Sequence, residues 1–362
     1  MFGFIRKKIK AKVFVGLSGG VDSAVSAALL KDQGYDVIGV YLRTWQPDWI
    51  TCTWQDERRD AMRVCAALNI PFIEHDVSKD YRKRVTEDMI ENYRNGRTPN
   101  PDVLCNKEIK FGLFFDWAMN NGADFVATGH YAQIATVNGA FHLVLAKDAS
   151  KDQSYFLWTL SPDILSKTIF PVGNLLKTEV RNLAKKFHIP VAQKKDSQGI
   201  CFLGLVDMKE FLAHYIQVTE GPVVTSAGKT IGTHQGVELY TYGERHGFNA
   251  QNEKGSTHEP LYVIGRDQKT NTLTVGTHDE YIQAGQSKKE YTLTDSVLRT
   301  VIKDNKIYDA AFRYHGKRYQ VQIKQNSTTL TILFENPEEL IASGQSIVLY
   351  DGNTCIGGGI VA

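Results

Sequence analysis

The chain has 362 residues, more than the roughly 100 to 200 of a usual single domain, and this length predicts two or three domains. Its composition, with 42% hydrophobic and 23% charged residues and only 10 prolines, excludes a mainly disordered protein. The net charge of +2 excludes binding to nucleic acid through overall charge, so any such contact must depend on local clusters.

The basic N-terminal segment lacks the apolar core of a secretory signal, and no run of about 18 apolar residues could form a membrane helix. We therefore expect a cytoplasmic protein with no membrane partner. Five widely spaced cysteines, at positions 52, 65, 105, 201 and 355, do not fit a secreted disulfide framework, and no zinc-ligand spacing is present. These thiols are expected to serve packing or catalysis.

The first half of the chain alternates apolar, β-rich runs with helical patterns, which is typical of a parallel sheet. Strands are expected at 12–17, 36–42, 72–77 and 124–130, and helices at 23–32, 56–68, 79–93 and 108–120. This order predicts an N-terminal doubly wound α/β domain.

From residue 221 onward, short alternating strands separated by Gly, Asn and Asp turns replace the helical patterns. Strands are expected at 261–264, 272–275, 319–324, 329–334 and 346–350. The pattern predicts a small β-rich central domain and a C-terminal β-barrel, with boundaries at 1–208, 209–285 and 286–362.

The sequence SGGVDS lies between the first predicted strand and the first predicted helix. Free backbone N–H groups and the helix dipole attract an anion there, and paired glycines let phosphate oxygens approach the main chain. The loop lacks the lysine of a Walker A motif and the G-x-G-x-x-G spacing of dinucleotide folds. The alternative is a tight turn in which Ser18 caps the helix.

This loop resembles the PP-loop of the ATP pyrophosphatases, whose adenine nucleotide alpha hydrolase-like domain cleaves ATP between the α- and β-phosphates and transfers AMP to a substrate oxygen. The resemblance implies ATP, expected with Mg²⁺ and without a dedicated protein metal site. The matching ATP-binding residues are Gly16, Leu17, Ser18, Gly19, Gly20, Val21, Asp22 and Ser23.

Two cysteines have distinctive surroundings. Cys105 follows a Pro-Asn-Pro-Asp segment, which we expect to form an extended loop before a helix, with Asp102 able to relay a proton. Cys201 follows the polar run Lys194 to Gly199. Taken singly, a cysteine is more often a buried packing residue, as we expect for Cys65 and Cys355, but the polar loops around Cys105 and Cys201 weigh against packing there, while Cys52 stays undecided.

With these loops the chain resembles, nearly end to end, the bacterial tRNA-specific 2-thiouridylases, which replace the 2-oxygen of the wobble uridine with sulfur. Further matching segments begin at Gly129, Lys151, Lys177 and Gly344. The resemblance implies that Cys201 carries a persulfide, that Cys105 is the nucleophile that assists its release through a transient disulfide, and that Asp102 is the acid/base. Glu244 stands where the family usually has Gln, and the 45–53 segment is less acidic than expected.

The resemblance also implies contacts with substrates. The residues matched to adenosine are Leu42 and Gly129, those matched to the target base are Asn100, Pro101 and Asp102, and those matched to tRNA are His130, Lys151, Asp152, Gln153, Arg313, Tyr314 and Gln345. The implied partners are a tRNA with a wobble uridine and a persulfide donor, either a cysteine desulfurase or a sulfur-relay protein.

The residues themselves add one indication of RNA binding. Between Asp309 and Glu335 no acidic residue occurs, while basic and aromatic residues alternate, so cations could neutralise phosphates and rings could stack on bases. The alternative is a solvated strand face of the barrel.

The expected reaction is adenylation of the uridine 2-oxygen, loss of pyrophosphate, and attack by sulfur from Cys201 with loss of AMP. Two alternatives stay open. A PP-loop synthetase that uses ammonia would not need the paired cysteines, and a catalytically inactive tRNA-binding protein would bind ATP without turning it over.

Overall fold

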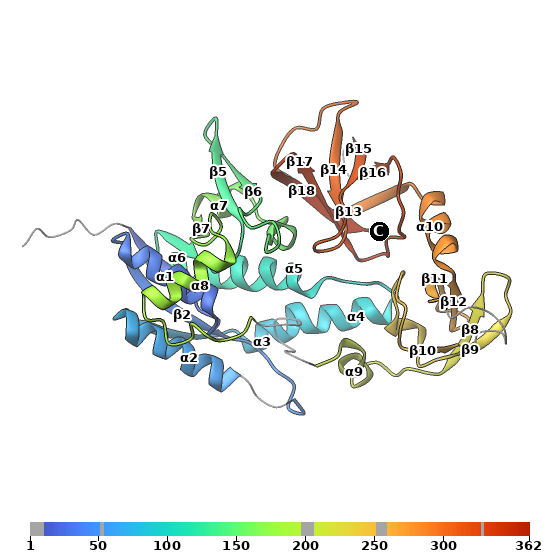
Figure 1. The fold of residues 1–362 in the computed structure, drawn as a ribbon, viewed down its shortest axis with the longest axis horizontal. Coiled ribbons are helices and arrows are strands. Elements are labelled where there is room, and N and C mark those ends of the chain that lie inside the picture. Colours follow the sequence, from blue (N-terminus) through green and yellow to red (C-terminus); the bar gives the residue numbers. More distant parts are fainter. Residues whose placement is uncertain (1–10, 51–53, 197–205, 251–258, 327–328) are drawn as a thin grey trace, which may run out of the picture. The chain divides into compact units, whose positions relative to one another are not determined.

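The computed structural model describes residues 11–50, 54–196, 206–250, 259–326 and 329–362 (Figure 1). Contacts divide the chain into two compact units. Unit 1 comprises Met1–Thr86, Pro101–Leu205 and Asn353–Ile356, and unit 2 comprises Glu87–Asn100, Val206–Gly352 and Gly357–Ala362. The segment 87–100 therefore belongs with the β-rich half of the chain, although it lies in the middle of the predicted N-terminal domain.

Unit 1 contains a five-stranded parallel sheet in the order β3-β2-β1-β4-β7. Its strands are β1 (Lys12–Gly16), β2 (Asp36–Arg43), β3 (Phe72–Asp76), β4 (Phe125–Ala127) and β7 (Thr168–Ile169). The order reverses at β1, as in a doubly wound fold. This confirms the predicted architecture of the N-terminal domain.

Helices cover both faces of this sheet. Successive side chains of β1 point to opposite faces, so each face of the strand packs against different helices. Val13 and Val15 pack with α1, α2 and α8, whereas Phe14 packs on the opposite face with α6. These helices are α1 (Val21–Asp32), α2 (Trp54–Leu68), α6 (Phe114–Asn120) and α8 (Lys177–Lys186).

Two predicted helices have different bounds. The first is divided into α3 (Ser78–Tyr81), the π-helical η1 (Arg82–Glu87) and α4 (Asp88–Arg94). The second begins at Pro101 rather than Glu108, as α5 (Pro101–Cys105), and continues through the π-helical η2 (Asn106–Leu113) into α6. Proline suits a first helical position because its missing N–H needs no partner there. The extended loop expected before Cys105 was therefore wrong.

Unit 1 also contains a hairpin of β5 (Gln133–Val137) and β6 (Ala140–Val144), and β6 pairs with residues 354–355. Its remaining helical elements are η3 (Ser154–Leu157) and α7 (Pro162–Ser166).

Unit 2 contains a second, five-stranded sheet in the order β10-β9-β8-β12-β11. Its strands are β8 (Gly221–Thr225), β9 (Thr230–His234), β10 (Phe248–Ala250), β11 (Tyr262–Asp267) and β12 (Thr272–Gly276). The helical elements beside them in sequence are α9 (Met208–Ala213), η4 (Val237–Leu239) and α10 (His278–Ser287).

The C-terminal strands close into a six-stranded barrel through the pairing of β13 with β18, which confirms the predicted barrel. They are β13 (Glu290–Leu298), β14 (Ile307–Ala311), β15 (Tyr319–Gln325), β16 (Leu330–Phe334), β17 (Ser346–Asp351) and β18 (Thr354–Val361). Gly357 has a φ of +142°, and a Cβ there would lie 1.9 Å from the Val297 carbonyl oxygen. The glycine therefore allows the closing strands to approach each other. Among the described residues, no helix has the length and apolar character needed to span a membrane.

Candidate nucleotide and thiol site

The SGGVDS loop lies at the carboxyl end of β1, where the strand order of the sheet reverses. Ligands of doubly wound folds bind in the crevice at this point, between the loops that follow the two diverging strands. Here these loops are residues 17–20 after β1 and 128–130 after β4.

Two glycines allow the loops to pack closely. A Cβ on Gly129 would lie 2.5 Å from the Ser23 backbone nitrogen, so the loop after β4 touches the first turn of α1 directly. Gly19 has a φ of +70°, and a Cβ there would lie 2.5 Å from the Glu57 carbonyl oxygen. Any side chain at either position would displace the loop.

The N-cap of α1 is Gly20, with no side-chain cap, so the alternative in which Ser18 caps the helix is wrong. Instead, Ser18 Oγ lies 3.3 Å from Ser23 Oγ, and Ser23 Oγ donates to the Gly20 carbonyl oxygen at 3.2 Å. The two hydroxyls thus brace the loop internally. The helix N-terminus keeps the positive end of its dipole at the crevice, as an anion site requires.

Asp22, in the first turn of α1, is held by two partners from distant parts of unit 1. Lys177 Nζ lies 2.7 and 2.9 Å from its two carboxylate oxygens, and the Tyr131 hydroxyl donates to Asp22 Oδ1 at 2.8 Å. Burial raises the pKa of Tyr131, and the charge of Asp22 raises it further, so the tyrosine stays a donor. The Lys177 side chain is only 15% exposed.

Asp196 gathers three cations beside the loop. Its carboxylate accepts from Lys177 at 2.9 Å, from Lys151 at 3.2 Å and from Arg181 at 2.5 Å. Burial raises the pKa of Asp196, but its bonds with Lys177 and Lys151 outweigh burial, and the net pKa is lowered. The Lys177 ammonium lies between Asp22 and Asp196, so a cation stands beside the loop where a phosphate would bind.

Lys194 joins the same region to the loop itself. Its ammonium donates to the Gly19 carbonyl oxygen at 3.1 Å and to Asp60 Oδ2 at 2.8 Å. Lys177, Asp196 and Lys194 were not among the predicted ATP-binding residues. In the sequence, Lys177 begins a segment that matches the family and Lys194 begins the polar run before Cys201, but only the fold brings these residues beside the loop that contains Gly19 and Asp22.

Cys105 is 2% exposed and lies at the end of α5. Asp102 lies in the first turn of the same helix, directly after Pro101, whereas Asn100 is the last residue of the preceding unit 2 segment. Cys201 and Cys52 lie outside the described residues.

The other two described cysteines are core residues. Cys65 is 1% exposed on α2, and burial raises its pKa to about 11. Cys355 is fully buried in β18. Both placements agree with packing roles.

His130 is buried beside the end of β4, with Phe111 and Phe170 as ring neighbours. Its Nδ1 lies 2.8 Å from Thr128 Oγ1, and its Nε2 lies 3.5 Å from Lys110 Nζ. Burial lowers the pKa of His130 well below its usual range, and the charge of Lys110 lowers it further.

This buried histidine should make stability depend on pH. The unfolded chain protonates the ring below a pH of about 6.5, but the folded chain resists protonation until lower pH. The stabilising contribution is therefore complete above about pH 6.5 and is lost as pH falls toward the folded-state pKa. Between about pH 7.5 and 5.5, we expect wild-type unfolding free energy to fall more steeply than that of His130→Gln, by up to about 1.4 kcal/mol per pH unit.

Urea denaturation at a series of pH values checks this expectation. His75 and His234 also have lowered pKa values, mainly through burial, and contribute equally to both proteins. Parallel pH profiles for the wild type and the variant would contradict the expectation.

The predicted tRNA-contact run 151–153 is engaged within unit 1. Gln153 exchanges two hydrogen bonds with the Tyr131 backbone, at 2.9 and 2.7 Å, and Asp152 accepts from Ser154 Oγ at 2.7 Å. These bonds shape the loop beside the cation cluster to which Lys151 belongs.

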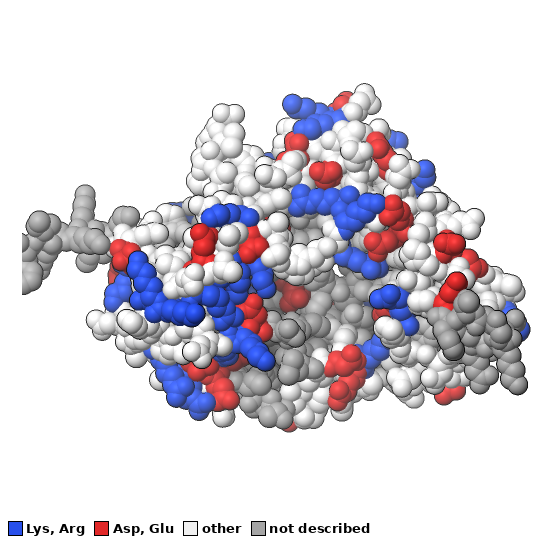
Figure 2. All heavy atoms as spheres, viewed as in Figure 1, with Lys and Arg blue, Asp and Glu red and all other residues white. Residues whose placement is uncertain are grey.

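In unit 2, Arg313 lies between β14 and β15. It pairs with Glu339 at 3.1 Å and donates to the Tyr242 carbonyl oxygen at 3.2 Å. Tyr314 is partly exposed and stacks on His315 with 3.8 Å between ring centroids. On the face shown in Figure 2, Lys and Arg side chains over the barrel lie beside Asp and Glu side chains rather than forming a continuous basic surface.

The alternating basic and aromatic residues between Asp309 and Glu335 lie partly in the loop that contains Arg313 and Tyr314 and partly on the strand β15. Tyr319 and Lys324 lie on β15, where Tyr319 is buried and Lys324 is exposed. This part of the pattern is therefore a solvated strand face of the barrel, as in the alternative interpretation.

Gln345 lies just before β17, and its side chain accepts from the Ala342 backbone N–H at 2.8 Å.

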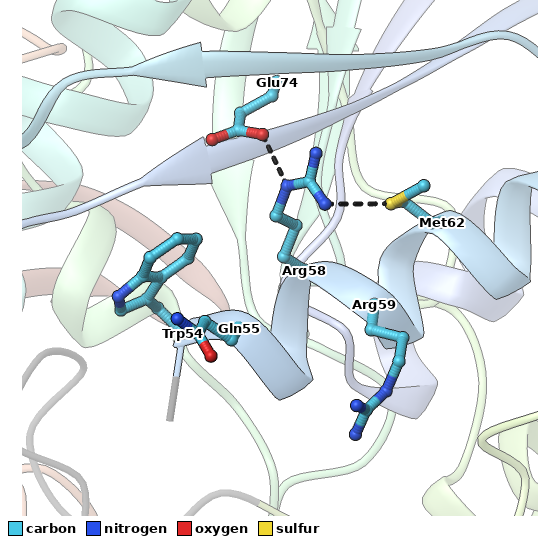
Figure 3. A pocket seen from close by; sticks show the side chains of 6 residues that line it. All are labelled: Trp54, Gln55, Arg58, Arg59, Met62 and Glu74. Atoms are coloured by element: carbon cyan, nitrogen blue, oxygen red, sulfur yellow. Dashed lines mark hydrogen bonds and ion pairs between the residues drawn. The ribbon is translucent and has the colours of Figure 1, made fainter. Parts of the chain in front are cut away.

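Leu42, matched to adenosine, is half-buried near the carboxyl end of β2. A separate open hollow of about 610 Å³ lies between α2 and β3 (Figure 3). In this view Arg58 points toward Glu74 and Met62, while Arg59 points away. Arg58 Nε is 2.5 Å from Glu74, and none of the residues predicted for the site lines this hollow.

Three family models match successive parts of the chain. The model described as tRNA methyl transferase HUP domain matches residues 11–205, the PRC-barrel model of the same group matches 209–277, and an aminomethyltransferase beta-barrel model matches 292–361.

Curated relatives match along almost the whole length. Proteins named tRNA-specific 2-thiouridylase MnmA are 42% identical over 358 residues in Streptococcus mutans and 42% over 357 residues in Enterococcus faecalis. Both alignments cover 97% of this chain and 95% of the relative. A solved U34-tRNA thiolase NcsA from Methanococcus maripaludis is 21% identical with a TM-score of 0.37, and the match covers 54% of this chain and 63% of that one. The chain belongs to the tRNA-specific 2-thiouridylase family.

Proposed function

We propose that this protein is a tRNA-uridine 2-sulfurtransferase, which converts the wobble uridine of a tRNA to 2-thiouridine. ATP adenylates the 2-oxygen and pyrophosphate leaves. Sulfur from a persulfide on Cys201 then replaces the activated oxygen, and AMP leaves. The observation that carries this proposal is the cluster of Asp22, Lys177 and Asp196 beside the glycine loop after β1.

The cluster supports the first half-reaction. Phosphate oxygens would meet backbone N–H groups at the start of α1, and the cations of the cluster would stabilise the charge that develops on the leaving pyrophosphate. Unlike a P-loop, which holds the β- and γ-phosphates with a lysine in the loop, the cation here comes from α8.

Mg²⁺ would accompany the nucleotide. The Asp22 carboxylate supplies the oxygen ligands that Mg²⁺ prefers, and Mg²⁺ is usually held by one or two carboxylates together with substrate phosphates. When bound, Mg²⁺ would neutralise charge on the phosphates.

The second half-reaction balances with two thiols. The terminal sulfur of the Cys201 persulfide attacks C2 of the uridine and displaces AMP, which leaves the base joined to Cys201 through a disulfide. The Cys105 thiolate attacks the Cys201 sulfur, forms a Cys105–Cys201 disulfide and releases 2-thiouridine. Asp102 would take up or supply the proton. An external thiol reductant then resets the pair.

The partners follow from this chemistry. The target base must leave its stack to reach the site, where Asn100, Pro101 and Asp102 would meet it, while Leu42 and Gly129 border the adenosine. Arg313, Tyr314 and Gln345 in unit 2 and His130, Lys151, Asp152 and Gln153 in unit 1 would contact the tRNA. A cysteine desulfurase or sulfur-relay protein would supply the persulfide in the cytoplasm.

Arg313→Ala should weaken tRNA binding about 5- to 30-fold, as expected for loss of one phosphate contact, and should reduce the slope of log affinity against log salt by about 1. Filter binding over a salt series measures both. Lys306→Ala is the matched control because Lys306 is also an ion-paired barrel cation, with Asp351 as partner. An equal loss in both variants, or an unchanged slope, would count against a phosphate contact by Arg313.

The test of the function is direct. Purified protein is incubated with ATP, Mg²⁺, unmodified tRNA and either sulfide or a persulfide donor, and the digested tRNA is examined for 2-thiouridine by mass spectrometry. If no donor yields 2-thiouridine, the proposal fails.

Parallel measurements separate the alternatives. A synthetase that uses ammonia would keep its activity in Cys201→Ser, and an inactive binding protein would retain tRNA without releasing pyrophosphate. The methyl transfer named in the family-model description would require S-adenosylmethionine, so a methylated nucleoside formed only with that donor would replace our proposal.

A further inference from the structure

The chain segment 94–98 ends two residues before Asn100 and is held inside unit 2 by both of its β structures. Asn100, Pro101 and Asp102 are the residues proposed to meet the target base, so the inference below rests on the proposed function. The chain leaves unit 2 at Asn100 and enters unit 1 at Pro101. Whatever holds residue 98 therefore limits where Asn100 can lie within unit 2, because each residue spans at most about 3.6 Å.

The central sheet and its loops hold this segment at three points. Thr98 Oγ1 lies 3.0 Å from Thr241 Oγ1, Arg266 donates to the Gly96 carbonyl oxygen at 2.9 Å, and Gln268 donates to the Arg94 carbonyl oxygen at 3.2 Å.

The barrel holds the same segment from the turn before β17 and from the last strand. The Thr98 N–H donates to the Ser343 carbonyl oxygen at 2.7 Å, and Arg97 donates to the Val361 carbonyl oxygen at 3.3 Å. A Cβ on Gly344 would lie 2.9 Å from the Thr98 nitrogen. Gln345, a proposed tRNA contact, is the next residue of this turn.

Thr98 thus contacts both the central domain and the barrel of unit 2. It is only 8% exposed, its side chain contacts the central domain, and its backbone contacts the barrel. Its partner Thr241 is itself fixed, because the Thr241 N–H donates to Glu244 Oε1 at 2.9 Å and Glu244 pairs with Lys209. The acceptor oxygen of Glu244 is one that a glutamine would also supply, so the departure from the family pattern keeps this bond.

We propose that Thr98 is a positioning residue, which sets the place of Asn100 within unit 2 relative to the barrel turn at 343–345, on which the tRNA would dock. Thr98 itself does not touch the substrate in this proposal. Loss of its side-chain bond should therefore slow the reaction of bound tRNA and leave the affinities for tRNA and ATP unchanged.

Thr98→Val removes the hydroxyl at nearly constant volume and takes this partner from the half-buried Thr241 hydroxyl. We expect kcat for 2-thiouridine formation to fall about 5-fold, the rate equivalent of one hydrogen bond, with the tRNA Kd and the KM for ATP within about twofold of the wild type. Thr98→Ser keeps the hydroxyl and should restore kcat. Thr241→Val should reproduce the loss, and the double Val variant should be no slower than either single variant.

Thr277→Val provides the matched control. Thr277 caps α10 in the same unit through a 3.3 Å bond from the Glu280 N–H, away from the segment. Its replacement should lower the melting temperature without lowering kcat. An unchanged kcat in Thr98→Val, an equal loss in Thr277→Val, or failure of Thr98→Ser to restore kcat would overturn the proposal. If the wild type forms no 2-thiouridine at all, the proposed function fails and this inference fails with it.

Discussion

Cys105→Ser should lower the rate of 2-thiouridine formation by at least about 100-fold while leaving tRNA-dependent release of pyrophosphate nearly unchanged. A serine hydroxyl is not ionised near neutral pH and cannot attack a disulfide sulfur, whereas adenylation precedes that step. Mass spectrometry of digested tRNA and a coupled pyrophosphate assay measure the two half-reactions separately. Cys201→Ser should likewise lose 2-thiouridine formation and keep tRNA-dependent release of pyrophosphate.

The burial of Cys105 makes this experiment decisive, because a thiol that is 2% exposed could equally serve packing alone. Cys65→Ala shows what loss of a packing thiol does. Since burial raises the pKa of Cys65 to about 11, that thiol is unreactive, and its replacement should cost stability but not specific activity. If Cys105→Ser behaves like Cys65→Ala, the thiol has no chemical role.

Lys177→Met should reduce pyrophosphate release by about 100- to 1,000-fold, the range found when a preorganised electrostatic contact to a developing charge is removed. One ammonium group connects Asp22 with Asp196, so its loss leaves both carboxylates near the phosphates without that cation. The affinity for tRNA should stay within about twofold. Lys177→Arg, which keeps the charge with a different geometry, should recover part of the rate.

Lys147→Met is the control for this variant. Lys147 also pairs with a residue of α8, Glu179, at 3.1 Å, but it is far more exposed than Lys177 and does not contact Asp22. Its replacement should leave pyrophosphate release unchanged. Equal rates in Lys177→Met and the wild type would show that the cluster has no part in adenylation.

Local features of the fold and of the site could be read from the sequence. The parallel sheet followed from alternating apolar strands and helices, and the glycine loop was recognisable because its chemistry lies in consecutive residues. By contrast, Asp22 and Lys177 are 155 positions apart, and no local pattern pairs them. The start of the helix at Pro101 was not predictable for a different reason, because a proline is as compatible with an extended loop as with the first turn of a helix.

The second half of the chain shows the same limit. The barrel was predictable from its short alternating strands. The sequence did not show which of the basic and aromatic residues between Asp309 and Glu335 are exposed in a loop and which lie on a strand. Tyr319 points into the barrel core, whereas Tyr314 lies in a loop with an exposed ring. Side-chain direction depends on the pairing of β15 with its neighbours, which composition does not contain.

The assignment of residues 87–100 to unit 2 has a consequence for dissecting the protein. A fragment that ends at residue 205, where the first family model ends, would carry α4 and Thr98 without Thr241, Arg266, Ser343 or Val361. Such a fragment would expose surface that the intact chain buries. We therefore expect the N-terminal portion to aggregate when expressed alone, and a split of this enzyme into separately produced halves would have to divide the chain elsewhere.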